Sequence, residues 1–190
     1  TAQSVTLAAI ASFCDPAATI DRFTALERVL ADWLTTDVQN QIMSVARTLI
    51  DAKDIYVIGK HIQFPAAMET AIKIKEASYI HAEGFAAGEL KHGVISLIEK
   101  GTPCIVLADA DTQTDVLSSA TELAARGGHI IGIAPFAASE FHTHIKTVEH
   151  DELTYVTNVI AGQLLGYYLS VGKGCDPDKP RNLAKSVTVK

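Results

Sequence analysis

In the first fifty residues, apolar positions recur among polar ones with the period of a helix. Apolar residues recur three or four positions apart within 21–34 and again within 37–52. Each segment opens with an aspartate, Asp21 or Asp37, that can cap a helix. A shorter apolar stretch, 4–13, ends just before Asp15 and Pro16, where a helix cannot continue. The pattern predicts three helices before any strand.

From residue 55 the pattern changes to short apolar, β-branched runs separated by helical segments. The runs 55–59, 103–109 and 129–135 predict strands buried on both faces, and 145–150 predicts a weaker one. Helices are expected at 65–77, 114–126 and 153–171. This alternation predicts an α/β fold with a parallel sheet covered on both faces. Such sheets bind ligands beyond the carboxyl ends of their strands, which here means 59–65, 109–111 and 135–140.

The last helix is expected to end at two glycines, Gly172 and Gly174. The residues beyond them include Leu183, Val187 and Val189, a composition that is unusual for a solvated terminus. We therefore expect this tail to dock on the protein. The predicted organisation is a helical connecting segment at 1–52, an α/β subdomain at 53–174 and a C-terminal tail at 175–190.

Composition and charge narrow the class of protein. The 190 residues are 48% hydrophobic, which suits one globular domain, and no apolar run reaches the roughly 20 residues of a membrane-spanning helix. A net charge of −6 without any basic run argues against nucleic acid as a partner. Three cysteines without C-x-x-C spacing favour a reducing compartment. We expect a soluble, cytoplasmic protein that binds neither nucleic acid nor membrane.

One stripe of the helix predicted at 65–77 carries three charged residues. Glu69, Lys73 and Glu76 are spaced i, i+4 and i+7, so the cation lies between two carboxylates. A solvated ladder of salt bridges accounts for this spacing by itself. The functional alternative is that Lys73 orients Glu76 as a general base.

The most polar stretch, YIHAEGFAAGELKHG at 79–93, combines two histidines with three glycines. Histidine can move protons near neutral pH, and glycine lets the backbone approach a ligand closely. A surface connection with hydrogen-bonded histidines explains the same residues equally well. His142 and His144 form an H-x-H pair without a third metal ligand at suitable spacing, and His61 is interpreted as a turn residue.

Other common signatures of chemistry are absent from the sequence. It has no serine nucleophile elbow, no P-loop and no dinucleotide-binding fingerprint. Lys185 in the tail becomes a Schiff-base nucleophile only if docking desolvates its amine and lowers its pKa. A solvated terminal lysine is the ordinary alternative.

Two long stretches carry a resemblance to a known family. KIKEASYIHAEGFAAGELKHG at 73–93 and DKPRNLAKSVTV at 178–189 closely resemble the C-terminal isomerase part of the glucosamine-6-phosphate synthases, the glutamine:fructose-6-phosphate amidotransferases. Weaker similarity covers almost the whole chain. The resemblance implies a sugar isomerase (SIS) fold, a three-layer αβα sandwich with a parallel flavodoxin-like sheet preceded by helices. It also implies an aminotransferase reaction, in which fructose 6-phosphate and glutamine-derived ammonia become glucosamine 6-phosphate.

The resemblance also implies roles for individual residues. Lys185 is similar to the lysine that forms an imine with the open-chain ketose, and Glu76 to the base that moves a proton between C1 and C2. His92 resembles the ring-opening histidine, which the neighbouring subunit of a dimer supplies, and Lys73 the lysine near the C1 hydroxyl. Ala184 joins Lys185 and Glu76 among the expected substrate-binding residues. No metal or redox cofactor is implied.

The sequence departs from the family pattern in two respects. It lacks the N-terminal glutaminase cysteine and the first isomerase subdomain, whose Ser/Thr-rich loop holds the phosphate. It is therefore expected to supply part of a site, with that subdomain and the glutaminase domain as partners. The loop GKHIQFP at 59–65 also stands where the family commonly has GRG and a tyrosine before the proline. Two alternatives stay open: a SIS domain that binds a sugar phosphate without reaction, and a related isomerase or deglycase that uses no ammonia.

Overall fold

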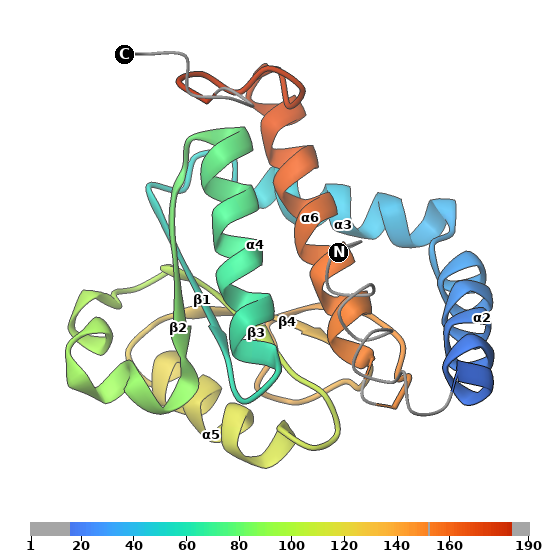
Figure 1. Cartoon of the computed structure of the whole chain (residues 1–190). Helices are drawn as coiled ribbons and strands as arrows, with labels where there is room; N and C mark the ends of the chain where they lie inside the picture. Colours follow the sequence, from blue (N-terminus) through green and yellow to red (C-terminus); the bar gives the residue numbers. More distant parts are fainter. Residues whose placement is uncertain (1–15, 152, 184–190) are drawn as a thin grey trace, which may run out of the picture.

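The computed structural model describes residues 16–151 and 153–183 (Figure 1). The helix predicted at 4–13 and the site residues Ala184 and Lys185 lie outside the described residues. The elements, in chain order, are α2 (Pro16–Trp33), α3 (Thr36–Thr48), β1 (Asp54–Gly59), α4 (Gln63–Ser78), β2 (His81–Ala86), η1 (Ala87–His92), η2 (Val94–Leu97), β3 (Pro103–Leu107), α5 (Gln113–Ala124), β4 (His129–Ala134), β5 (Thr143–Lys146) and α6 (Thr154–Gly172).

The five strands form one parallel sheet in the order β2-β1-β3-β4-β5. This is the doubly wound order of flavodoxin-like folds, in which the chain reverses direction across the sheet between β1 and β3. The predicted α/β fold with a flavodoxin-like parallel sheet is confirmed.

Strand β2 is the one strand of this sheet that the sequence pattern does not predict. It lies within 79–93, so the interpretation of that whole stretch as a surface connection is wrong for residues 81–86. The strand is at the edge of the sheet, and among its first three residues only Ala82 is buried, whereas His81 and Glu83 are exposed. A short edge strand with so few buried positions has no continuous apolar run to reveal it.

Helices cover both faces of the sheet, as the three-layer prediction requires (Figure 1). Alternate residues of β1 show the division, because Ile55 and Val57 pack in the core beneath α3, α4 and α6. Tyr56 and Ile58 point the other way, into the core beneath α5 and the short helix η1. The sheet is thus buried on both faces, as its β-branched strands predict.

Two helices begin at residues other than the predicted caps. Helix α2 starts at Pro16, which suits the first turn because it needs no backbone N–H there, so Asp21 lies inside the helix. Helix α3 is capped by Thr35, whose hydroxyl accepts from the Val38 N–H at 3.4 Å, while Asp37 lies in the first turn. The predictions of aspartate caps at these two positions are wrong.

Helices α4 and α6 pack closely because α6 has glycines where they meet. A Cβ atom on Gly162 would lie 2.2 Å from the Thr70 hydroxyl, and one on Gly166 would lie 3.1 Å from the Lys73 backbone. Only a residue without a side chain allows this separation. Helix α6 therefore fixes the backbone of α4 at Lys73.

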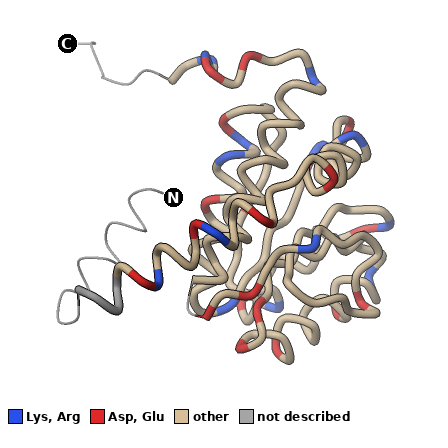
Figure 2. Tube along the Cα trace, turned by 90° about the vertical axis from the view of Figure 1, so that its right-hand side faces the viewer, with Lys and Arg blue, Asp and Glu red and all other residues tan. Residues whose placement is uncertain are grey.

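Charged residues are distributed without large segregation along the chain. Figure 2 shows Lys and Arg interspersed with Asp and Glu over the described residues. Within that part of the chain, no helix has the length and apolar character that a membrane span needs.

Candidate functional site

The structure brings Lys73 and Glu76 together at the end of α4. Lys73 Nζ lies 2.7 Å from Glu76 Oε2 and 3.9 Å from Glu69 Oε1. Helix α4 follows the carboxyl end of β1 and returns to the beginning of β2, so its last turn lies at the amino edge of the sheet. The predicted charged stripe is present, with side chains 35–38% exposed.

Lys73 has the electrostatics of a permanent cation. The hydrogen bond to Glu76 raises the pKa of Lys73 above its ordinary value, against the opposing effect of partial burial, and Glu69 adds to the increase. At neutral pH the amine is therefore protonated and cannot serve as a base. It can hold the Glu76 carboxylate in place and stabilise negative charge beside it.

Glu76 lines two cavities. One, of about 410 Å³, is lined by Ile72, Lys75, Glu76, Tyr79, Arg181, Asn182 and Leu183. The other, of about 200 Å³, is lined by Lys73, Glu76, Ala77, Gln163, Tyr167, Pro177 and Pro180. In both, α4 forms one wall and the segment 177–183 contributes to another. The described part of the tail thus docks beside Glu76.

Several residues of these walls were not found from the sequence. Gln163 donates from Nε2 to Glu69 Oε1 at 3.2 Å, which links α6 to the charged stripe, and Tyr167 lines the smaller cavity. The Tyr79 hydroxyl accepts a hydrogen bond from the backbone N–H of Arg181 at 2.8 Å. Among these residues, Tyr79 and Arg181 have a signal in the sequence, because they lie within the two stretches that carry the resemblance. Gln163 and Tyr167 lie outside both stretches.

His92 lies at the other edge of the sheet. It ends η1, which follows the carboxyl end of β2, and it is exposed. Leu90 of the same short helix is buried in the core, and Lys91 pairs with Glu122 of α5 at 2.9 Å. The six residues of β2 span about 20 Å, so His92 and Glu76 of one chain do not meet.

The carboxyl edge of the sheet, where we expected a ligand, holds a buried polar network. Asp109 accepts from the Gln63 amide at 2.8 Å and from the Thr112 N–H and hydroxyl at 2.8 and 2.6 Å. Asn158 donates to Gln63 Oε1 at 3.0 Å and accepts from the Thr147 hydroxyl at 2.7 Å. All five side chains are at most 6% exposed. Their polar groups are engaged with one another.

The histidines of interest are engaged in backbone interactions. His142 Nδ1 accepts from the Ile130 N–H at 2.9 Å, and His144 Nε2 donates to the Ala134 carbonyl at 3.0 Å. His61 lies in a turn with φ of 50°, which confirms its interpretation as a turn residue. Among residues 16–151 and 153–183, no three His, Cys, Asp or Glu side chains are grouped closely enough to hold a metal ion.

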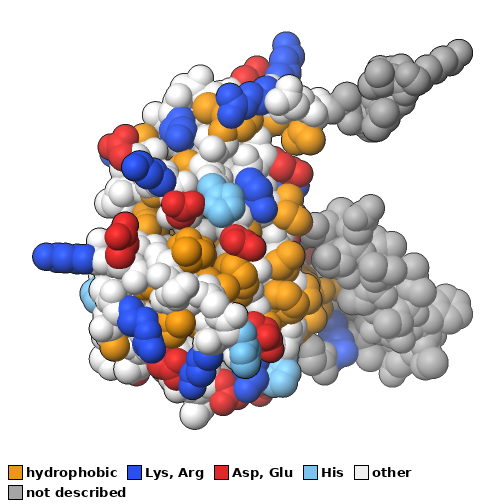
Figure 3. Space-filling model, turned by 90° about the vertical axis from the view of Figure 1, so that its left-hand side faces the viewer, with side chains coloured by type: hydrophobic (Ala, Val, Ile, Leu, Met, Phe, Trp, Pro, Cys, Tyr) orange, Lys and Arg blue, Asp and Glu red, His pale blue; other side chains and the backbone are white. Residues whose placement is uncertain are grey.

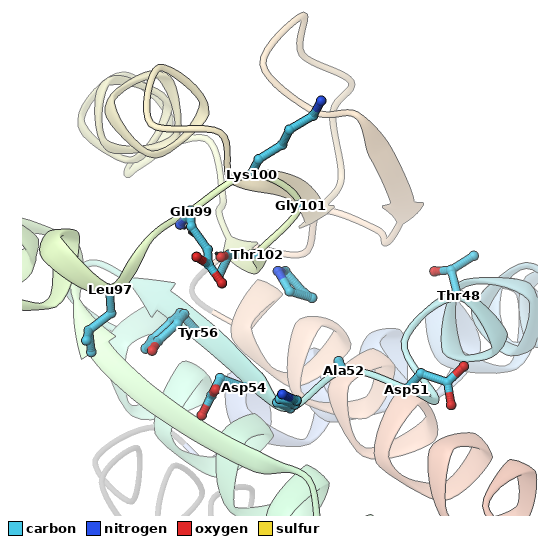
Figure 4. Close-up of a pocket in the computed structure, with 12 residues that line it drawn as sticks. Thr48, Asp51, Ala52, Asp54, Tyr56, Leu97, Glu99, Lys100, Gly101 and Thr102 are labelled. Atoms are coloured by element: carbon cyan, nitrogen blue, oxygen red, sulfur yellow. Dashed lines mark hydrogen bonds between the residues drawn. The ribbon is translucent and has the colours of Figure 1, made fainter.

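A third cavity, of about 510 Å³, lies at the amino ends of β1 and β3 (Figure 4). Its lining includes both carboxylates and lysines, but Lys100 and Asp51 point away from each other. Glu99 is bound through its backbone N–H to the Thr102 hydroxyl at 3.0 Å. The side chains do not converge on a common point, in contrast to those around Glu76.

The parallel five-stranded sheet and its αβα layers are those of a sugar isomerase domain. The chain belongs to the SIS domain family, whose model matches residues 48–171.

Known relatives sharpen this assignment. The chain is 43% identical over 159 residues to glutamine–fructose-6-phosphate aminotransferase (isomerizing) from Caldanaerobacter subterraneus, and 46% identical over 159 residues to the protein of that name from Mesorhizobium japonicum. Each match covers 80% of this chain and 26% of the relative, so the chain spans about a quarter of their length. The C-terminal domain of glucosamine-fructose-6-phosphate aminotransferase from Francisella tularensis superposes with a TM-score of 0.65 and 28% identity, over 74% of this chain and 41% of that one. The resemblance seen in the sequence is confirmed.

Proposed function

We propose that the chain is the second isomerase subdomain of a glucosamine-6-phosphate synthase. In this proposal it converts fructose 6-phosphate and glutamine-derived ammonia into glucosamine 6-phosphate, together with a first isomerase subdomain and a glutaminase domain. The observation that carries the proposal is the Lys73–Glu76 pair beside the segment that leads to Lys185. Glu76 lines two cavities together with this segment, and Lys73 lines the smaller of them. The identity of 43–46% to aminotransferases of this name supports the choice of reaction.

The chemistry assigns one step to each residue. The amine of Lys185 adds to the C2 carbonyl of the open-chain ketose and releases water as the imine forms. Ammonia adds to the imine carbon and displaces the lysine amine, which leaves the ketimine of the sugar and frees Lys185. Glu76 then accepts a proton from C1 of this ketimine and returns it at C2, while the C1 hydroxyl proton passes to the nitrogen; a positioned carboxylate is suited to such a transfer. Lys73, protonated and hydrogen-bonded to Glu76, holds that carboxylate near the C1 hydroxyl. Ala184 belongs to the same substrate-binding tail.

We infer a homodimer in which His92 of one chain opens the sugar ring at the site of the other. A hexose is far shorter than the roughly 20 Å of β2 that separates the two edges, which supports a second chain as the source of the histidine. Figure 3 shows apolar side chains gathered on the face that carries edge strand β2, flanked by charged residues. On α4, Met68 and Ile72 are 39% and 37% exposed. Such a surface suits an interface.

We also propose a cytoplasmic location. The described cysteines, Cys104 and Cys175, are both free thiols, which agrees with a reducing compartment.

Borohydride trapping tests the proposed function. The chain, linked to its first isomerase subdomain and glutaminase domain, is incubated with fructose 6-phosphate, reduced and mapped by peptide mass. We expect a hexitol-phosphate adduct on the peptide that contains Lys185 and none in Lys185→Arg. The isolated 190-residue chain should give far less, since it lacks the remote phosphate contacts that position the sugar. An adduct confined to Lys73 or Lys91 would contradict the proposal. A chain that binds the sugar phosphate but never forms an adduct would be a non-catalytic domain.

A further inference from the structure

Tyr79 occupies a fixed position between α4 and β2, three residues after Glu76. It ends α4 in the left-handed region, with φ of 60°, and its N–H donates to the Lys75 carbonyl at 3.2 Å. Two residues later β2 begins, with His81 in register with Asp54 of β1. The tyrosine ring is thus attached to a turn that is held by the helix on one side and the sheet on the other.

Arg181 contacts this tyrosine in two independent ways. The backbone N–H of Arg181 donates to the Tyr79 hydroxyl at 2.8 Å. Its guanidinium carbon lies 4.0 Å from the centroid of the Tyr79 ring, the geometry of a cation–π contact. The two residues are 102 positions apart, so these contacts tie the C-terminal segment to the end of α4. We call this pair the Tyr79–Arg181 clasp.

The segment between α6 and the clasp is itself turned back toward α4. The Cys175 N–H donates to the Ser170 carbonyl at 2.9 Å, and Gly174 has φ of 69°. Pro177 and Pro180 line the smaller cavity beside Glu76. After Arg181, Asn182 again has a positive φ, of 63°. The backbone thus changes direction on both sides of this segment.

We propose that Tyr79 and Arg181 are positioning residues that hold the tail so that Lys185 is presented to the Glu76 cavity. This inference rests on the proposed function. Leu183, two residues after Arg181, lines the same 410 Å³ cavity as Glu76 and Tyr79. Lys185 is two residues further, and two Cα–Cα steps of 3.80 Å limit its distance from Leu183 to about 7.6 Å.

The effect of the clasp on the rate of imine formation depends on the length of the chain that tethers Lys185. With the clasp, Lys185 is tethered by the four residues from Arg181. Without it the tether is longer, and it reaches at most the 13 residues from Gly172, at the end of α6, if the contacts of Pro177 and Pro180 are lost as well. The effective concentration of a tethered group falls roughly as the −3/2 power of tether length. Losing the clasp should therefore slow formation of the imine by up to about sixfold.

Variants separate the two halves of the clasp. Tyr79→Phe removes the hydroxyl acceptor and keeps the ring, whereas Arg181→Ala removes the cation and keeps the N–H. Neither change touches the core, because Arg181 is exposed and Tyr79 retains its ring. Arg181→Lys restores a cation without the planar guanidinium. The matched control is Tyr168→Phe, which removes a tyrosine hydroxyl bonded at 3.3 Å to Gln39 of α3, away from Glu76.

The experiment measures the rate of borohydride trapping on Lys185, together with KM for fructose 6-phosphate and the melting temperature, in the complete protein. We expect the Tyr79→Phe/Arg181→Ala double variant to trap measurably more slowly, by up to about sixfold, with unchanged KM and melting temperature. Each single variant should lose less, Arg181→Lys less than Arg181→Ala, and Tyr168→Phe should trap at the wild-type rate. An unchanged trapping rate in the folded double variant would overturn the clasp alone. Absence of any Lys185 adduct in the wild type would overturn the proposed function and the clasp with it.

Discussion

The two edges of the sheet differ in how their polar side chains are used. At the carboxyl edge, Gln63, Asp109 and Asn158 are buried and bonded to one another. At the amino edge, Lys73 and Glu76 are more than one-third exposed and line open cavities. Parallel α/β sheets generally bind ligands at the carboxyl edge. Here that edge is occupied by the protein's own groups, and the pair that we propose as catalytic lies where α4 ends at the opposite edge.

The largest effect on stability is expected from the carboxyl edge. Asp109→Ala removes the acceptor of three buried donors, from Gln63 and Thr112, and should lower the free energy of unfolding by about 3 kcal/mol. Denaturant unfolding measures this. The control Asp111→Asn, at an exposed neighbour, should stay within about 0.5 kcal/mol of wild type. If the two variants were equally stable, the carboxyl edge would not be the closed structural network described above.

A smaller effect is expected where α6 positions the amino-edge site. Gly162→Ala would place a methyl group 2.2 Å from the Thr70 hydroxyl, and the resulting overpacking should cost about 2 kcal/mol. Gly88→Ala is the matched control, because a Cβ there meets no atom within 4 Å. Thermal melting of both variants checks the difference. A Gly162→Ala protein as stable as Gly88→Ala would show that α4 and α6 adapt easily.

The smallest effect is a pH dependence at the amino edge, where His129 begins β4. Burial lowers the pKa of His129 below 6.5, and the neighbouring His142 lowers it further. The unfolded chain therefore takes up this proton first as the pH falls. Its contribution to stability is present above pH 6.5 and is lost as the pH falls through the folded-state pKa. Denaturant unfolding at pH 7 and at pH 5 measures this effect. Between the two, the free energy of unfolding should fall less in His129→Gln than in wild type. The control is His61→Asn, in an exposed turn, whose free energy of unfolding should fall as much as that of wild type. If the decrease in His129→Gln equalled that of wild type, this account would be contradicted.

The sequence predicts those parts of the fold that have either a helical period of apolar residues or a continuous apolar run. The strands at β1, β3 and β4 are continuous apolar runs, which only a doubly covered sheet explains. Strand β2 was missed because its exposed positions interrupt any such run.

The candidate site was predictable in part. The spacing of Lys73 and Glu76 places them on one helical stripe, so their contact follows from local geometry. The Tyr79–Arg181 contact and the Gln63–Asp109–Asn158 network join positions 46 to 102 residues apart. No local pattern contains that information.

Proton exchange tests directly which edge performs the chemistry. The complete protein is incubated with fructose 6-phosphate in deuterated water, and incorporation at C1 and C2 is followed by NMR for Glu76→Gln and Asp111→Asn. The first variant keeps the shape of the amino-edge side chain without a proton acceptor, and the second removes an exposed carboxylate of the carboxyl edge. We predict that Glu76→Gln slows exchange by a factor of about 100 or more while Asp111→Asn exchanges at the wild-type rate. Normal exchange in Glu76→Gln, or its loss in Asp111→Asn alone, would contradict the assignment of the site to the amino edge.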